Sequence, residues 1–334
     1  MAGAGTQKRL LCVYQILREY TDEEYGITIK DIALILEAEY RIVSARRSLY
    51  GDIAALRDFG VDICMVKSHD TRYYLGSREF ELAELKILID LVQNSKFITK
   101  KKSEELITKI KGLTSLRQGR ILEKQANLNC SLKTTNEQIY YNVDKLQHAI
   151  AAKKQVEFLY SQWVLNFGHL DMVAKSYRKN GKKYVVSPYG LIWNDDNYYL
   201  VAYDGNSEKI KHYRVDKMER IEILYGERTG IKEFLKMDFP DYKKTVFGMF
   251  GGEPQKVKIR FENSLVGAVA DRFGKDVKIE KYDACHFVAE VDVVISGKFF
   301  GWLFAFGDKA KIMEPEKTVK EFRKFAKSVL KLYN

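Results

Sequence analysis

A histidine, an arginine and a lysine lie close together at the end of a stretch rich in aromatic residues, between Tyr184 and Lys217. If Ile210 to Val215 forms a strand, His212 and Arg214 share a face, because alternate side chains of a strand point the same way. Cationic groups bind phosphates, hydroxyls exchange hydrogen bonds, and aromatic faces stack on bases. We therefore expect a nucleotide or a short single-stranded nucleic acid to contact Ser187, Tyr189, Trp193, Tyr199, His212, Arg214 and Lys217.

A structural role is the alternative for several of these residues. The aromatic side chains can fill a core, and Arg214 can pair with Asp216 or Glu219. Alternation favours the pocket for Arg214, because His212 shares its face whereas Asp216 shares it only if the strand continues. His212 is interpreted as a ligand-contacting or core residue and not as a catalytic one.

Three short strands are expected to position these side chains. The segments 184–193 and 198–203 are rich in β-branched and aromatic residues, and the Asn-Asp-Asp-Asn run at 194–197 between them favours a turn. A second turn at 204–206 leads into the third strand. Alternation places Tyr199, Val201 and Tyr203 on one face of the middle strand. Such a meander predicts a small β-barrel with a polar and aromatic pocket.

This stretch resembles the WYL domain. The resemblance rests on PYGLIWNDDNYYLVAYD followed by HYRVDKM, in which Tyr198, Tyr199 and Leu200 stand at the Trp-Tyr-Leu signature. Arg214 matches the first Arg of the family's F-R-x-D-R segment, and Lys217 replaces the second. The resemblance implies a mostly bacterial regulator that joins a winged helix-turn-helix to a WYL barrel and a C-terminal extension. It also implies that the WYL domain senses a nucleotide or nucleic acid.

The N-terminal segment, from 1 to 80, is expected to form three helices followed by a hairpin. Leu11, Tyr14 and Leu17 follow helical spacing, and Thr28 with Asp31 is typical of a capping box. The expected elements are helices over 8–20, 28–37 and 40–59 and strands over 61–66 and 73–75. This order predicts a winged helix-turn-helix domain.

The third of these helices is the candidate for reading DNA. Residues 41–51 contain three arginines and no acidic residue, which suits a helix in the major groove. The run ARRSLYGDI resembles the family's S-R-R-T-I-Y-R-D-I, with Ala45 and Gly51 in place of Ser and Arg. The residues expected to contact duplex DNA are Thr28, Ser44, Arg46, Arg47, Ser48, Tyr50, Lys67 and Arg72, the last two from the wing.

The middle and the end of the chain are expected to connect and extend these domains. Two helices, over 79–93 and 102–117, would join them and support dimerisation. A helix over 143–152, a strand over 156–160 and an irregular loop over 166–182 would precede the barrel. Glycines and aromatics at 231–254 suggest a hinge. The final segments predict the order β-α-β-β-α-β, typical of a ferredoxin-like unit: strand 257–261, helix 264–273, strands 277–282 and 287–294, helix 298–306 and strand 310–313.

Composition limits the classes of function. The chain of 334 residues has a net charge of +11, yet residues 1–80 hold 11 basic and 12 acidic side chains, so DNA binding there depends on local clusters. Four scattered cysteines fit a reduced, cytoplasmic protein without a metal site. The sequence contains no catalytic motif, phosphate loop or apolar run of membrane length. We expect no enzyme activity, no cofactor and no membrane association.

Together these observations predict an α+β multidomain chain. The expected parts are a winged helix-turn-helix (1–76), a helical linker (77–135), a small SH3/Sm-like β-barrel of the WYL type (136–230), a hinge (231–254) and a ferredoxin-like extension of the WCX type (255–334). The expected function is a homodimeric transcriptional regulator that binds double-stranded operator DNA and senses a nucleotide or nucleic acid. The alternative is a single-stranded nucleic-acid-binding accessory protein of a defence or DNA-damage pathway.

Overall fold

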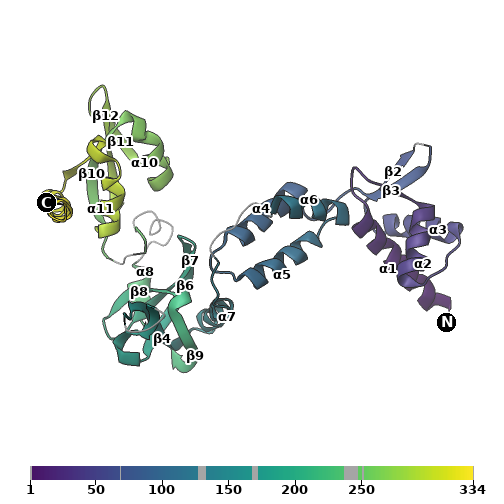
Figure 1. The fold of residues 1–334 in the computed structure, drawn as a ribbon, viewed down its shortest axis with the longest axis horizontal. Helices are drawn as coiled ribbons and strands as arrows, with labels where there is room; N and C mark the ends of the chain where they lie inside the picture. Colours follow the sequence, from purple (N-terminus) through teal and green to yellow (C-terminus); the bar gives the residue numbers. More distant parts are fainter. Residues whose placement is uncertain are drawn as a thin grey trace. The chain divides into compact units, whose positions relative to one another are not determined.

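A computed structural model describes residues 2–67, 69–126, 133–167, 172–236, 247–249 and 252–333 (Figure 1). These residues form a mixed α and β fold with several sheets, one of them curled into a half-barrel. Contacts divide the chain into two units, Met1–Glu137 and Gln138–Asn334. In the described ranges, no helix has both the length and the apolar character that crossing a bilayer requires.

The first unit begins with three helices and a three-stranded sheet in the order β1-β3-β2. Its elements are α1 (Ala2–Tyr20), β1 (Ile27–Thr28), α2 (Ile29–Tyr40), α3 (Arg46–Asp58), β2 (Ile63–Lys67) and β3 (Thr71–Leu75). The helices pack around a common core, and β2 and β3 form a hairpin beside them (Figure 1). The order of three helices and a hairpin is the one expected from the sequence; β1 was not expected.

Two expectations for these helices are wrong. Leu11 is 67% exposed, and the buried side of α1 carries Cys12, Val13, Ile16 and Leu17 instead. The helix expected over 40–59 begins only at Arg46, because α2 continues to Tyr40 and ends at Arg41 in a left-handed conformation with φ 55°. There the N–H of Arg41 bonds to the Glu37 carbonyl, and residues 41–45 connect the two helices without regular secondary structure.

The rest of the first unit is helical. It contains α4 (Leu82–Asn94), α5 (Lys100–Lys111) and α6 (Leu116–Ala126) around a small core of Leu85, Ile89 and Leu122. The single helix expected over 102–117 is wrong, because a break after Lys111 separates α5 from α6. Ser115 begins the second helix by accepting a hydrogen bond from the Gln118 N–H at 3.1 Å.

Buried polar contacts join this helical segment to the three-helix part. Asp22 is almost completely buried and accepts hydrogen bonds from Ser115 at 2.7 Å and from both Nε and Nη2 of Arg117. These bonds hold the pKa of the Asp22 carboxyl below its usual value, against the opposing effect of burial. The start of α6 is therefore fixed to the loop that follows α1.

The second unit begins with α7 (Gln138–Ala151) and a curled six-stranded sheet. Its strands are β4 (Lys154–Leu165), β5 (Val173–Tyr177), β6 (Tyr184–Asn194), β7 (Asn197–Asp204), β8 (Lys209–Arg214) and β9 (Met218–Glu227). They pair in the order β5-β4-β6-β7-β8, and β9 also pairs with β4. Four aromatic rings pack on one another inside the curl: Phe158, Tyr160, Tyr184 and Tyr213.

Part of the chain before β6 is more regular than expected. The loop expected over 166–182 contains β5 and a short 3-10 helix, η1 (Arg178–Gly181); residues 168–171 lie outside the described ranges. The extended segment β9 was also not expected. Of the hinge expected at 231–254, α8 (Ile231–Leu235) occupies the start, and residues 237–246 and 250–251 lie outside the described ranges.

The last part of the second unit has the expected order of elements. It contains β10 (Gln255–Glu262), α10 (Val266–Phe273), β11 (Lys278–Lys281), β12 (His286–Val293), α11 (Gly297–Phe304), β13 (Ala310–Glu314) and α12 (Glu316–Leu330). The strands pair antiparallel in the order β11-β12-β10-β13, so the first strand lies between the third and the fourth. Its core is built from Val257, Ile259, Phe261, Phe299 and their neighbours.

Candidate nucleic-acid interface

The outer face of α3 carries the exposed residues of the DNA-binding prediction. Leu49, Ile53 and Leu56 face the core, whereas Arg46, Arg47 and Tyr50 are exposed. The residue that precedes the helix, Ala45, offers no side-chain acceptor to the first N–H groups of α3. Two guanidinium groups and one phenol therefore project from the first turn and a half of this helix, where charged and polar groups of a ligand can reach them.

Asp52 has a different role from its neighbours on α3. Its carboxylate is buried and accepts two hydrogen bonds from Arg9, from Nε at 2.6 Å and from Nη2 at 3.0 Å. This bidentate pair ties α1 to α3 and raises the pKa of the Arg9 guanidinium. The sequence run that contains the expected DNA contacts thus also contains a residue that holds the helix in place.

The remaining residues of the DNA-binding prediction are less available or lie on the wing. Thr28 caps α2, and its hydroxyl group is bonded to Asp31, as the capping box predicts. Ser44 and Ser48 are half-buried. Lys67 and Arg72 are exposed on the β2–β3 hairpin. Because Arg72 pairs with Thr28 across the β1–β3 ladder, the wing and the start of α2 lie side by side.

In the second unit, the sheet register brings several predicted ligand contacts together. Tyr199 is paired with Arg214, and Val201 with His212, so Tyr199, His212 and Arg214 lie on one face of β7 and β8. Trp193 is paired with Tyr198 and lies on the opposite face, with the two rings 4.9 Å apart and edge to face. The seven predicted residues therefore do not line one pocket.

Ser187 and Tyr189 contact the segment after β9 instead. The Ser187 hydroxyl accepts a hydrogen bond from the Thr229 N–H at 2.9 Å, and the Tyr189 hydroxyl donates one to the Thr229 carbonyl at 2.8 Å. The Tyr189 ring also stacks on Phe234 with centroids 4.2 Å apart, and the Arg228 guanidinium lies 4.6 Å from its centre. Both residues hold α8 and the chain before it against β6.

Tyr199, in the WYL signature, packs in a small apolar cluster. Its side chain contacts Met249 and Val294, together with Ile192 from the neighbouring strand. Tyr199 is 9% exposed, and burial raises the pKa of its hydroxyl group. The signature tyrosine thus connects the curled sheet to the part of the chain that follows it.

Arg214 forms the ion pair that was the structural alternative. Its Nε and Nη2 donate to the two carboxylate oxygens of Asp216 at 2.9 and 2.8 Å, and Nη2 also donates to Asn197 at 2.8 Å. Alternation favoured the pocket because Asp216 shares the face of Arg214 only if the strand continues, yet the pair forms without a longer strand. The strand ends at Arg214, and the short 3-10 helix η2 (Val215–Lys217) returns Asp216 to the guanidinium.

Burial changes the charge state available at His212 and Lys217. Burial lowers the pKa of His212 to about 4, so its imidazole is neutral at pH 7 and supplies no phosphate-binding charge. Burial also lowers the pKa of Lys217, and the positive charges of Arg214 and Arg178 lower it further, while Asp216 opposes them. Lys217 lies on η2, three residues after Arg214, and its carbonyl accepts a hydrogen bond from the Ser161 hydroxyl.

Arg178 was not among the site residues predicted from the sequence, but it lies beside the strand that carries Tyr160. Its Nε donates to Gln162 at 3.1 Å, two residues beyond Tyr160 on β4. The Tyr160 hydroxyl accepts a hydrogen bond from the Arg214 N–H at 3.0 Å. Burial raises the pKa of this phenol, and the positive charges of Arg214 and Arg178 act against that rise. We call Arg178, Arg214 and Lys217 the cationic cluster. The sequence signal that could have identified Arg178 was the basic run RKNGKK at 178–183.

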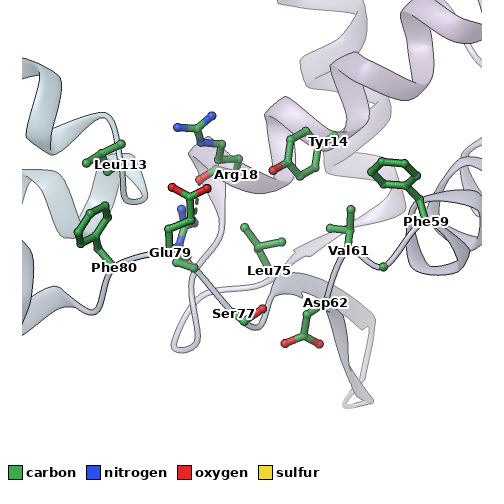
Figure 2. A pocket seen from close by; sticks show the side chains of 12 residues that line it. Tyr14, Arg18, Phe59, Val61, Asp62, Leu75, Ser77, Glu79, Phe80 and Leu113 are labelled. Carbon is green, nitrogen blue, oxygen red and sulfur yellow. Dashed lines mark hydrogen bonds between the residues drawn. The ribbon is translucent and has the colours of Figure 1, made fainter.

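A separate hollow lies in the first unit and contains none of the predicted site residues. It measures about 450 Å³ and is lined by Tyr14, Phe80 and Leu113 among others (Figure 2). Arg78, at its wall, donates through Nη2 to the carbonyl oxygens of Arg18 and Thr21 at 2.7 and 2.6 Å. These carbonyls lie at the C-terminal end of α1, so Arg78 stabilises a helix terminus.

Comparison with known sequences identifies the two domains of the second unit. Sequence models of the WYL domain and the WCX domain match residues 170–223 and 253–330. The chain contains a WYL domain and a WCX domain. The WCX match covers the segment from β10 to α12, and the WYL match covers β5 to the first half of β9. No curated protein matches the chain.

Two solved structures are similar to this WYL-domain protein at low sequence identity. Proteasome accessory factor B/C (PafBC) of Arthrobacter aurescens is 17% identical, with a TM-score of 0.30; the match covers 98% of this chain and 49% of PafBC. A CRISPR Cas-related protein is 13% identical, with a TM-score of 0.39, and the match covers 95% of this chain and 97% of that protein. The chain therefore spans about half the length of PafBC.

Proposed function

We propose that this WYL-domain protein is a DNA-binding transcriptional regulator whose WYL domain binds a nucleotide or nucleic-acid effector. The observation that carries the proposal is the combination of a WYL and a WCX domain with a preceding unit of three helices and a hairpin. In the proposal, residues 1–76 act as a winged helix-turn-helix, the next helices as a linker, the curled sheet as an SH3/Sm-like barrel and the last segment as a ferredoxin-like extension.

The accessibility of α3 supports the DNA-binding part. Arg46, Arg47 and Tyr50 project from its first turns, and Lys67 and Arg72 project from the hairpin. In a winged helix-turn-helix, the third helix enters the major groove and the wing contacts the backbone phosphates. Arginine side chains on the helix can reach guanine or phosphate oxygens. Because the segment from 1 to 80 is not basic overall, these few side chains would supply most of the attraction.

The cationic cluster supports the effector part. Arg214 donates its backbone N–H to the Tyr160 hydroxyl and pairs with Asp216, Lys217 follows on η2, and Arg178 is bonded to Gln162, two residues beyond Tyr160. These three cations outnumber the carboxylate of Asp216, so the positive charge is only partly compensated. A phosphate or phosphodiester matches this excess charge, and a guanidinium presents its donors in a fork that suits phosphate oxygens. His212 takes part as a neutral contact in this proposal. No phosphate need displace Asp216, since Arg178 is bonded to Gln162 and not to that carboxylate.

We also propose a homodimer, because a single winged helix makes few contacts with DNA. Operator affinity normally comes from two half-sites that are one helical turn or a multiple of it apart. Exposed apolar residues on the linker helices, such as Ile87 at 60% and Leu91 at 64%, are available for such an interface. Light scattering of the full chain would distinguish a dimer from a monomer of 38.8 kDa.

Binding of single strands as the main task remains the second candidate. The charge distribution favours it, because the residues beyond position 80 carry all of the net positive charge. In this alternative, the curled sheet and the WCX domain would bind a single strand in a defence or DNA-damage pathway, and the winged helix would be secondary. Mobility shifts with duplex upstream DNA and with short single strands separate the two proposals.

The test of the first proposal is a double substitution on α3. Removing Arg46 and Arg47 as Arg46→Ala/Arg47→Ala should weaken operator binding by at least about 2 kcal/mol at moderate salt, the value of two base or phosphate contacts. The matched control is Lys100→Ala/Lys101→Ala, which removes the same charge from exposed positions at the start of α5. If the α3 variant shifts its operator as well as the control does, α3 is not the recognition helix.

A further inference from the structure

The hairpin of β4 and β5 carries an exposed row of large side chains. The register pairs Ser161 with Tyr177, Trp163 with Lys175, and Leu165 with Val173, so these side chains lie on one face. Trp163 is 62% exposed, Leu165 66%, Val173 55% and Tyr177 37%. Phe167 follows β4 and is 81% exposed. We call the face formed by Trp163, Leu165, Val173, Lys175 and Tyr177 the hairpin face.

A basic run accompanies the hairpin face. Between Val173 and Lys183 the chain has five basic residues and no acidic one. Lys175 lies 5.5 Å from the centre of the Trp163 ring, with Glu219 3.6 Å away, and Lys183 pairs with Glu157. Over the described ranges, Arg178, Lys179 and Lys182 are exposed and have no carboxylate within 4 Å. Lys179 lies 4.0 Å from the centre of the Tyr184 ring, a contact that leaves its charge in place. The positive charge of these three residues is therefore not neutralised by a carboxylate of the described ranges.

The hairpin face needs a partner that matches both its apolar and its cationic character. A row of exposed aromatic and aliphatic side chains on a sheet edge usually marks an interaction surface. A second copy of this chain fits poorly, because a two-fold pairing of the same hairpin would bring Lys175 and the basic run of both copies together. An acidic protein surface would match the charge of the cations, but it offers no flat groups that stack on the exposed aromatic rings.

A single-stranded nucleic acid matches both properties. Its phosphates carry the opposite charge, and its unstacked bases can lie on aromatic rings, whereas bases in a duplex are already stacked. Trp163 and Tyr177 belong to neighbouring pairs on this face, and the paired stretch from Ser161 to Leu165 extends over about 13 Å at the usual rise of a strand, with Phe167 beyond its end. This length suits a short oligonucleotide.

The hairpin face also continues into the cationic cluster. Arg178 follows Tyr177 directly and donates a hydrogen bond to Gln162 on β4. The Ser161 hydroxyl donates to the Lys217 carbonyl at 3.1 Å, which places η2 beside the same part of β4. A single-stranded nucleic acid bound along the hairpin face would therefore reach Arg178, Arg214 and Lys217 at one end of that face.

We propose that the hairpin face is a base-stacking platform that binds a single-stranded nucleic acid of several nucleotides, one end of which is held by the cationic cluster. This inference rests on the proposed effector binding and specifies its ligand as an oligonucleotide. Trp163 is the principal stacking residue, Phe167 and Tyr177 are further ones, and Lys175 with the basic run contacts the phosphates.

The test measures how Trp163 affects oligonucleotide binding and mononucleotide binding separately. Fluorescence anisotropy of the full chain would use a labelled dodecathymidylate, its duplex with dodecaadenylate, and thymidine monophosphate as a competitor. Trp163→Ala should weaken binding of the single strand by about ten-fold or more, the loss expected for one stacked base, and leave competition by the mononucleotide unchanged. Trp163→Phe should restore most of the affinity, because a ring face remains.

A control variant removes an even more exposed aromatic residue from the same curled sheet. Tyr225 on β9 is fully exposed, and Tyr225→Ala should leave the affinity for the oligonucleotide unchanged. If Trp163→Ala binds the single strand as the parent does while Arg214→Ala does not, the platform is wrong and the proposed effector binding stands. If the parent binds neither oligonucleotide nor mononucleotide, both are wrong. A change of sedimentation in Trp163→Ala with unchanged oligonucleotide affinity would make the face a protein interface and also overturn the platform.

Discussion

The two units present their arginines in different ways. On α3, Arg46 and Arg47 are exposed, and within the described ranges neither has a carboxylate within 4 Å. In the WYL domain, Arg214 is half-buried and fixed by both oxygens of Asp216 and by Asn197. The first arrangement leaves the guanidinium groups without an acidic partner among the described residues, and the second holds one between Asp216 and Asn197. A phosphate that reached the first site would find guanidinium donors that pair with no carboxylate of the described residues, and one that reached the second would find a guanidinium already bonded to Asp216.

This difference separates residues whose removal affects binding from residues whose removal affects the stability of the fold. An exposed cation without an intramolecular partner adds little to the free energy of unfolding, so its removal reports on binding. A cation that also joins parts of the fold affects both quantities. In the first unit, that second role belongs to Arg9 and Asp52, which lie behind the exposed arginines of α3. In the WYL domain, we propose that one residue, Arg214, combines the two roles.

The largest expected effect is at the buried pair behind α3. Asp52→Ala leaves Arg9 half-buried without its bidentate partner, and we expect it to lower the free energy of unfolding of the first unit by about 3 kcal/mol. Arg46→Ala/Arg47→Ala should change it by less than about 0.5 kcal/mol. Urea unfolding, followed by hydrogen exchange of α1 and α3, measures the free energy of unfolding of both variants. Equal stability of the two variants would remove the distinction between anchoring and binding residues on this helix.

The next effect concerns the buried imidazole of the WYL domain. The pKa of His212 is lowered to about 4 in the folded chain, whereas the unfolded chain has an ordinary value near 6.5. The unfolded state therefore binds the proton more tightly, and stability that is complete above pH 6.5 is lost as the pH falls toward 4. Between pH 7 and pH 5 this loss amounts to about 2 kcal/mol.

The control for this pH dependence is a residue that cannot be protonated in the same range. His212→Gln should lose about 2 kcal/mol less stability than the parent between pH 7 and pH 5, because the other titrating groups are shared. Thermal unfolding at both pH values gives the difference. A parent and a variant with parallel pH profiles would mean that the imidazole is not kept neutral by burial, and it would again be available as a cation at the site.

Local sequence signals predicted the parts of the fold that depend on neighbouring residues. The capping box of Thr28 and Asp31 is present, and the turn at 194–197 forms with Asp195 and Asp196 at positive φ, as Asn-Asp runs favour. The order of strands and helices in the C-terminal segment followed from alternation and helical spacing. In contrast, the end of α2 was missed because Arg41, a residue with no helix-ending preference, adopts the left-handed conformation.

The candidate site was harder to predict because it depends on long-range pairing. Arg178 reaches the cationic cluster only because β5 pairs with β4, and no local pattern indicates that partner. The return of Asp216 to Arg214 depends on the short η2 after the strand, where simple alternation fails. Tyr199 was identified from the signature, but its contact with Val294 involves residues almost a hundred positions apart. Residue types were informative, whereas their grouping required the sheet register.

The smallest expected change in stability, and the sharpest test of the WYL site, is at Arg214. Its pair with Asp216 is partly exposed, at 36% and 27% for the two side chains, so Arg214→Ala should cost at most about 1 kcal/mol of stability. The same variant should abolish binding of short oligonucleotides in calorimetry, a binding that falls steeply with salt in the parent.

Asp216→Asn is the matched variant, because it keeps the shape, frees the guanidinium and removes a negative charge, so we expect binding to become several-fold tighter. Loss of binding in both variants would make the fixed orientation of Arg214 the essential feature. A stability loss above about 2 kcal/mol in Arg214→Ala, the range of a broken buried pair, with binding retained would make Arg214 structural. The cationic cluster would then no longer be the effector site.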